Sequence, residues 1–209
     1  MVASFLALGR TISGWAVALC FVTITSATGG PLQEAASRGD LDLIARSLDQ
    51  GSDIAELDDA GDPALVIASL KGQTDAVALL LERGADIEAR NKGGLTALHA
   101  ASYAGKVDVV ELLLAKHADV NDNKNFYSMS PLHAAAEEGH ADVVAVLLEN
   151  KADFEAGERN GYTPLTQAGW RGYWDVAGLL MKAGAKCQKA EIVGEPLYQE
   201  CTKRMNAGP

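Results

Sequence analysis

The chain alternates between two kinds of short apolar segment. One kind is rich in alanine around a single leucine, as in Leu98 to Ala101, and the other is a block of valine and leucine, as in Val109 to Leu114. In the second kind the apolar residues recur at the spacing that places them on one face of a helix. A glycine separates the two segments, where one helix ends and the chain turns back. The pattern therefore predicts pairs of short helices.

This pair of helices recurs with a fixed period. The anchoring leucines are Leu32, Leu65, Leu98, Leu132 and Leu165, and they are 33, 33, 34 and 33 residues apart. One such unit cannot bury its apolar face alone, so stability must come from stacked neighbours. We expect one elongated domain over residues 28–209, with repeats at about 31–57, 58–90, 91–124, 125–157 and 158–190 and a C-terminal cap at 191–209.

The repeated unit has a specific consensus. It combines Thr/Ser-Pro-Leu-His, then Ala-Ala, a glycine, a Val-Val-x-Leu-Leu-Leu block and Gly-Ala-Asp-Val, and Gly94 to Val120 is the copy with which the others are compared. At this period and with these residues it resembles the ankyrin repeat. The resemblance covers most of the chain and implies an all-α solenoid with protruding hairpin loops. It also implies that His99 and His133 form hydrogen bonds between adjacent loops.

The residue types at several positions of the repeat are explained by their place at the ends of helices. Hydroxyl side chains precede the first helix, where they can accept from free amides of the first turn; they are Thr96, Ser130 and Thr163. An acid opens each second helix, as expected at a helix N-terminus; these are Asp42, Asp75, Asp108, Asp142 and Asp175. Repeats three and four lack the glycine that ends the second helix and have His117 and Lys151 there, at an expected cost of about 1 kcal/mol each.

Residues 1–27 do not belong to the array. They contain one base, Arg10, an apolar run from Ile12 to Ile24, and small residues up to Ala27. This order is typical of a secretory signal peptide, with cleavage expected after Ala27. The apolar run is short for a membrane span, which needs about 20 residues. The alternative is a membrane anchor through residues 11–27.

The number of cysteines is consistent with export of the protein. If the signal is removed, Cys187 and Cys201 remain as an even pair. Two such cysteines in an exported chain suggest a disulfide that fastens the last helix to repeat five. The alternative is two reduced, buried thiols in a cytosolic protein.

The net charge and the lack of catalytic motifs limit the classes of function that the sequence allows. The formal net charge of −10 argues against binding to a phosphate backbone, so we expect no nucleic acid partner. No nucleophile–base pair, phosphate loop or metal-ligand spacing occurs, and the histidines and acids fall at regular repeat positions. We therefore expect no enzyme activity, no cofactor and no metal.

The resemblance implies that variable positions on the hairpin tips and the first helices line a concave, partner-binding surface. Five of the fifteen positions are aromatic, although aromatic residues make up only 6% of the chain, and aromatic residues dominate interface energies. Three of the fifteen positions are Leu70, Lys71 and Arg90. The other twelve form the predicted protein-binding site: Lys92, Leu95, Tyr103, Phe126, Tyr127, Met129, Glu137, Glu138, Arg159, Tyr162, Trp170 and Arg171.

These aromatic residues predict an exposed apolar patch over repeats three to five. An extra residue near Asn121 to Tyr127 lengthens one hairpin, which carries Phe126 and Tyr127. The alternative is that Tyr173 and Trp174 pack against the cap and Phe126 folds over its own loop.

The leading hypothesis is an exported, monomeric, non-enzymatic scaffold that binds a protein partner, similar to small bacterial periplasmic ankyrin proteins. Its location would be periplasmic or secreted. A second hypothesis is a secreted effector that engages a host protein. An enzyme or metal carrier built on the solenoid and a membrane-tethered form are the remaining alternatives.

Overall fold

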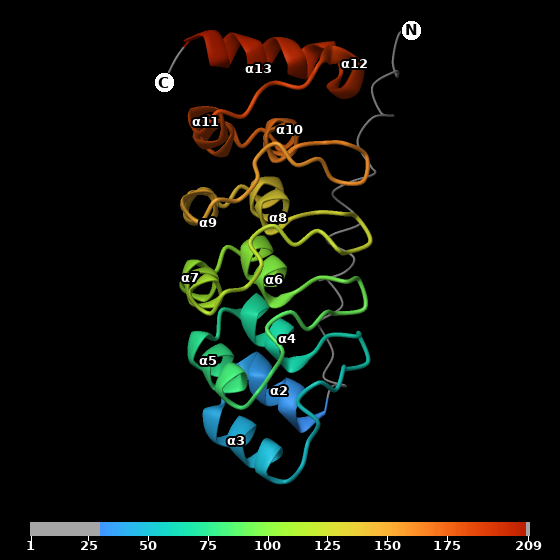
Figure 1. The fold of residues 1–209 in the computed structure, drawn as a ribbon, viewed down its shortest axis with the longest axis vertical. Coiled ribbons are helices and arrows are strands. Elements are labelled where there is room, and N and C mark those ends of the chain that lie inside the picture. Colours follow the sequence, from blue (N-terminus) through green and yellow to red (C-terminus); the bar gives the residue numbers. More distant parts are fainter. Residues whose placement is uncertain (1–29, 208–209) are drawn as a thin grey trace, which may run out of the picture.

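The computed structural model describes residues 30–207 as an elongated stack of paired helices (Figure 1). The predicted signal segment, residues 1–27, lies outside this range. The pairs are α2 (Pro31–Arg38) with α3 (Leu41–Asp49), α4 (Ala64–Lys71) with α5 (Thr74–Glu82), α6 (Ala97–Tyr103) with α7 (Val107–Ala115), α8 (Pro131–Glu138) with α9 (Ala141–Glu149), and α10 (Pro164–Arg171) with α11 (Trp174–Ala183). The helices α12 (Ala190–Val193) and α13 (Glu195–Ala207) close the C-terminal end. The predicted all-α repeat solenoid is confirmed.

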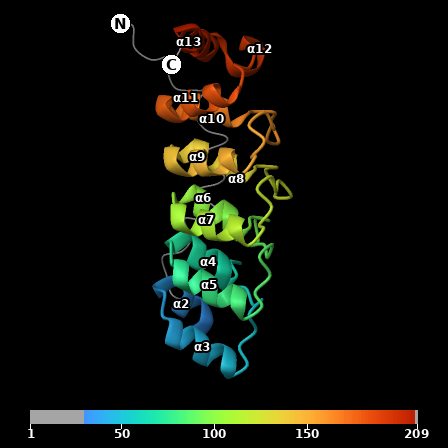
Figure 2. The same cartoon turned by 60° about the vertical axis from the view of Figure 1, so that its left-hand side comes forward.

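The helices form two columns. The first helices of the pairs, α2, α4, α6, α8 and α10, are called the inner helices, and the second helices, α3, α5, α7, α9 and α11, the outer helices. The loops that lead to each next pair project together on one side of the stack, beside the inner helices (Figures 1 and 2). We call the surface made by the inner helices and these hairpin loops the inner face.

The main core runs the length of the stack between the two columns. The anchoring leucine of every inner helix is at most 2% exposed, and Leu80, Leu113, Leu147 and Leu180 of the outer helices are fully buried. Full burial of a leucine stabilises the fold by about 1.5–3 kcal/mol. Because each apolar face needs the next pair to cover it, the repeat period predicted this core.

A second, smaller cluster lies apart from the main core. It contains Val66, Leu95, Ala100 and Met129, with Leu70, Tyr103 and Tyr127 packed against it as partly buried members. Val66 and Ala100 belong to inner helices, whereas Leu95 and Met129 end hairpins. This cluster therefore joins the hairpins to the inner helices on the inner face.

The turns agree with the sequence. The glycine that ends α8, Gly139, has a φ of 78°. After the outer helices α7 and α9, His117 and Lys151 have φ values of 68° and 66°, the left-handed conformation that was expected of them. A side chain with a Cβ adopts this conformation at a cost.

The C-terminal end is closed by a covalent link. The structure joins Cys187 and Cys201 in a disulfide with the two Cα atoms 5.9 Å apart. A Cβ on Gly169 of α10 would meet Leu197 of α13, which shows how closely the last helix is packed on repeat five. The link thus holds α13 against repeat five, as the sequence predicted.

Candidate protein-binding surface

Histidines fix the hairpins of repeats four and five in place. The Nε2 atom of His99 in α6 donates to the Met129 carbonyl, at 2.8 Å, and its Nδ1 atom lies 2.9 Å from the Thr96 hydroxyl oxygen. His133 in α8 repeats the arrangement, with Nε2 3.1 Å from the Tyr162 carbonyl and Nδ1 2.8 Å from the Ser130 hydroxyl. The hydrogen bonds between adjacent loops that the resemblance implied are confirmed.

Both histidines are fully buried. Burial lowers the pKa of His133 to about 4 and also lowers the pKa of His99, because the charged ring would lose its hydration. The rings are therefore neutral at pH 7, which suits one nitrogen that donates and one that accepts. The hairpins they hold are a fixed platform near neutral pH.

Polar side chains inside the loops add to this platform. The Asn125 side-chain oxygen accepts from the backbone amides of Tyr127 and Met129, and Asn91 does the same for Gly93 and Leu95. These asparagines were not among the predicted site residues. The signal was present in the sequence, since Asp58, Asn91, Asn125 and Glu158 recur at one phase of the repeat.

A buried ion pair stiffens the hairpin before α8. Two nitrogens of Arg90 donate to the two carboxylate oxygens of Asp122, each at 2.8 Å, and the Asp122 side chain is 1% exposed. Burial alone would raise the pKa of Asp122, but the hydrogen bonds and the positive charge of Arg90, together with the hydrogen bond from the Lys124 backbone, outweigh it, so the pKa is lowered. Arg90, expected to face a partner, instead supports the loop.

The tip of the hairpin between repeats three and four is aromatic and exposed. Phe126 is 64% exposed and meets Tyr127 edge to face, with ring centroids 5.0 Å apart. The guanidinium of Arg159, on the next hairpin, lies 4.6 Å from the centre of the Phe126 ring and donates to the Phe126 carbonyl at 3.2 Å. Phe126 therefore does not fold away over its own loop.

A second aromatic pair lies in repeat five. Tyr162 of the hairpin and Trp170 of α10 meet edge to face with centroids 4.4 Å apart, and Trp170 is 41% exposed. Large aromatic side chains exposed on a rigid scaffold are favourable anchors for a partner. We name Phe126, Tyr127, Tyr162 and Trp170 the aromatic patch.

Three predicted contact residues prove to be buried. Leu95 and Met129 are 2% and 3% exposed, because they end their hairpins and point into the second cluster. Glu137 is 2% exposed and bonds through one oxygen to Arg171 of the next repeat, at 2.7 Å. Burial raises the pKa of Glu137, and the hydrogen bond from Arg171 offsets part of that effect. These three residues support the surface from below.

The remaining predicted residues lie on or beside the surface. Lys92, Arg159 and Arg171 are exposed, and Tyr103 and Glu138 are partly exposed. The alternative arrangement, in which Trp174 packs against the cap, is the one observed. Trp174 packs on the core beside α13, and the Arg204 guanidinium lies 4.2 Å from its ring centre. Tyr173 lies against Gly139 of the preceding repeat.

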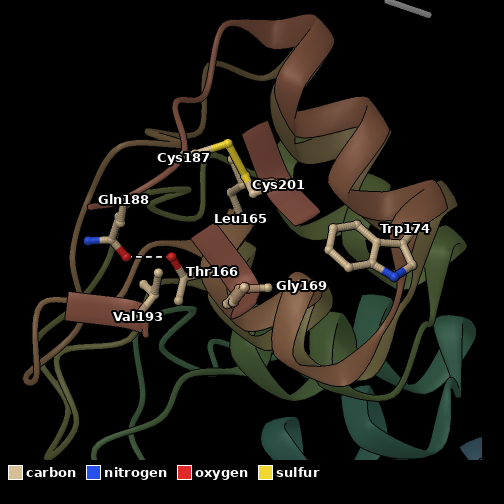
Figure 3. Close-up of a pocket in the computed structure, with 9 residues that line it drawn as sticks. Leu165, Thr166, Gly169, Trp174, Cys187, Gln188, Val193 and Cys201 are labelled. Atoms are coloured by element: carbon tan, nitrogen blue, oxygen red, sulfur yellow. Dashed lines mark hydrogen bonds between the residues drawn. A yellow bond between two sulfur atoms is a disulfide. The ribbon is translucent and has the colours of Figure 1, made fainter. Parts of the chain in front are cut away.

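A small pocket lies between repeat five and the cap, where Leu165, Gly169, Trp174 and the disulfide line it (Figure 3). Its volume of about 10 Å³ is at the lower limit for one water molecule. Among residues 30–207, no cluster of three or more histidine, cysteine or acidic side chains has the geometry to hold a metal ion. Within the same residues, no helix combines the length and apolar character needed to cross a membrane.

Stacked helix pairs with interlocked hairpins define a repeat solenoid. A family model described as ankyrin repeats in three copies matches residues 32–124 and 119–191. The chain therefore belongs to the ankyrin repeat family, whose members are typically non-enzymatic binding modules. No curated protein is similar enough to this chain to count as a match.

Proposed function

We propose that the protein is a non-enzymatic, monomeric scaffold that binds a protein partner through the inner face of repeats three to five. The observation that carries the proposal is the aromatic patch. Phe126 on its hairpin is 64% exposed and Trp170 on α10 is 41% exposed, and the hairpins beside them are held by buried hydrogen bonds. Such side chains lose little conformational freedom on binding, which favours affinity.

We further propose that the protein is exported to the periplasm or secreted. Two observations support export: the arrangement of basic, apolar and small residues up to Ala27, and the Cys187–Cys201 bridge. Disulfides persist in oxidising compartments and are rare in the cytosol. An intact mass that begins at Thr28 and lacks the two hydrogens of a disulfide is the expected result, and a full-length, reduced mass would contradict it.

The binding proposal is tested with Phe126→Ala and Trp170→Ala in one chain. We expect capture of the partner from an extract of the native cell to fall at least about tenfold, because two aromatic anchors commonly contribute more than 1.4 kcal/mol. The matched control is Leu41→Ala with Ile192→Ala, two exposed apolar residues outside the patch. Both variants should keep the helical circular dichroism of the unmodified protein. Undiminished capture by the Phe126 and Trp170 variant would move the site elsewhere.

The same patch would serve a secreted effector that engages a host protein. That alternative predicts release of the protein from the cell, whereas a periplasmic scaffold stays within it. Fractionation of the culture distinguishes the two.

A further inference from the structure

The proposed function leaves the chemistry of the partner open, and the charges of the inner face address it. We propose that the partner presents an acidic, extended segment of about seven residues to the hairpin tips from Lys92 to Arg159. At least one apolar side chain of that segment contacts the aromatic patch. This inference rests on the proposed function.

Charge is distributed unequally between the two columns of helices. Within their bounds, the outer helices carry nine carboxylates and two cationic side chains, which are Asp42, Asp49, Asp75, Glu82, Asp108, Glu111, Asp142, Glu149 and Asp175 against Arg46 and Lys182. The inner helices α4, α6, α8 and α10 carry Lys71, Glu137, Glu138 and Arg171, and are balanced. Of the two columns of helices, the outer one therefore carries the excess negative charge, on the side away from the aromatic patch.

Exposed cationic groups surround the patch. Lys92 and Arg159 occupy equivalent hairpin tips on either side of Phe126, and Arg171 follows Trp170. Glu137 is buried against Arg171, and Glu158 is buried and accepts from the backbone amide of Asn160 in its own loop. Complementarity at the tips thus favours an anionic partner.

The outer carboxylates do not cancel this preference. Adjacent packed helices are separated by about 10 Å, and at physiological ionic strength charges more than about 8 Å apart in solvent are largely screened. A segment bound at the hairpin tips is therefore little affected by the carboxylates of the outer helices.

Arg159 is prepared to bind a carboxylate. Its guanidinium lies over the Phe126 ring, 4.6 Å from the ring centre, and one N–H group donates to the Phe126 carbonyl. A guanidinium has five N–H donors in a fixed plane, so others remain for a two-point contact with an acidic side chain. Stacking on Phe126 restrains the long side chain before the partner arrives, which reduces the entropy lost on binding.

The spacing of the tips sets the length of the segment. Lys92 and Arg159 belong to hairpins two repeats apart, and repeats that stack at about 10 Å place these tips roughly 20 Å apart. An extended chain advances about 3.3 Å per residue, so about seven residues connect them. Phe126 lies on the hairpin between the two cationic tips, where it meets the middle of the segment.

The probe that tests the inference is a displayed library of random seven-residue peptides, selected on the purified protein. The peptides that bind are synthesised, and their Kd values are measured at low and high salt. We expect selected peptides rich in Asp and Glu with an apolar residue near the middle. We also expect Lys92→Glu with Arg159→Glu to weaken their binding at least about tenfold, and salt to weaken it as well.

The matched control is Lys116→Glu with Lys182→Glu, which changes the net charge equally at two exposed positions on or beside the outer helices. It should shift the Kd by less than about twofold, since surface charges at that distance are screened. Lys92→Gln with Arg159→Gln replaces the reversal variant if the latter loses its helical circular dichroism.

Other outcomes separate this inference from the proposed function. Neutral or basic peptides whose binding is lost in the Phe126→Ala, Trp170→Ala variant would overturn the acidic segment and leave the binding surface standing. Acidic peptides that bind the tip-reversal variant as well as its control would also overturn it. Peptides that bind the Phe126→Ala, Trp170→Ala variant at full strength would overturn both proposals.

Discussion

The middle of the stack and its C-terminal end hold the next segment of chain by different chemistry. In repeats three and four, a buried histidine reaches the carbonyl of the following hairpin. In repeat five, Thr166 occupies that position and its hydroxyl donates to the Gln188 side chain, which in turn donates to the Gly161 carbonyl at 2.7 Å (Figure 3). Cys187, the residue before Gln188, carries the disulfide.

The difference reflects what each region has beside it. A middle repeat is covered on both sides, and hydrogen bonds from buried polar side chains hold its hairpin. Within residues 30–207, repeat five is followed by the cap instead of a sixth repeat, and the cap consists of a short α12 and an α13 with little buried surface. A covalent link restrains such an end without requiring a larger core, as is common where cores are small.

Removal of the disulfide should have the largest effect, and should be confined to the end. For a closed loop of this size, the chain-entropy model gives about 3 kcal/mol. In the double variant Cys187→Ser with Cys201→Ser, we expect amide hydrogen exchange to become faster in α12 and α13, and then in α10 and α11. The amides of α4 to α7 should keep their protection, because repeats contact only their neighbours. Exchange measured by mass spectrometry tests this. Equal loss of protection along the stack would contradict it.

The buried histidines should make the middle repeats sensitive to acid. The unfolded chain protonates His133 near pH 6.5, whereas the folded chain does so only near pH 4. The stability from neutral His133 is therefore complete above about pH 6.5 and is lost as the pH falls, by about 2 kcal/mol between pH 7 and pH 5. His99 acts in the same direction.

Urea unfolding at pH 7 and pH 5 measures this term. His133→Gln should be less stable than the unmodified protein at pH 7, because hydrogen bonds are lost, but its stability should fall less between the two pH values. The control is His117→Asn, an exposed position with left-handed backbone that asparagine tolerates. An unchanged pH dependence in His133→Gln would show that this ring is not the group that titrates.

The smallest effect concerns the helix ends. Repeat five ends its outer helix with Gly184, whereas repeat four has Lys151 with a φ of 66°. Lys151→Gly should raise the melting temperature, by a gain of about 0.5–1 kcal/mol in unfolding free energy. Gly184→Ala should lower the unfolding free energy by a similar amount. The added Cβ would meet Phe154 only at ordinary contact distance, so the loss comes from the left-handed backbone and not from a clash. Shifts in the opposite directions would contradict this.

The sequence predicted those features that depend on residues within one repeat. The leucine period predicted the helix pairs, and the absence of glycine at His117 and Lys151 predicted their left-handed backbone. The bonds of His99 and His133 came from the resemblance. These features recur in nearly every copy, so the pattern carries them.

Features that depend on contacts between different side chains of adjacent repeats were not predicted. Leu95 and Met129 stand at hairpin positions where the family varies, but here they enter a second apolar cluster. Glu137 occupies the position equivalent to Tyr103 and Trp170, yet Arg171 of the next repeat draws it inward. Whether such a side chain points outward depends on its neighbour one repeat away, which a residue's own position in the period does not specify.

The bridge between Cys187 and Cys201 also has a mechanical consequence. When the two ends of the chain are pulled apart, the residues between the two cysteines carry no load, because the sulfur–sulfur bond bypasses them. The link spans a sequence separation of 14 residues, so roughly 45 Å of extended chain is withheld from the contour length. A single molecule stretched under oxidising conditions should therefore reach full extension that much earlier than the same molecule after reduction.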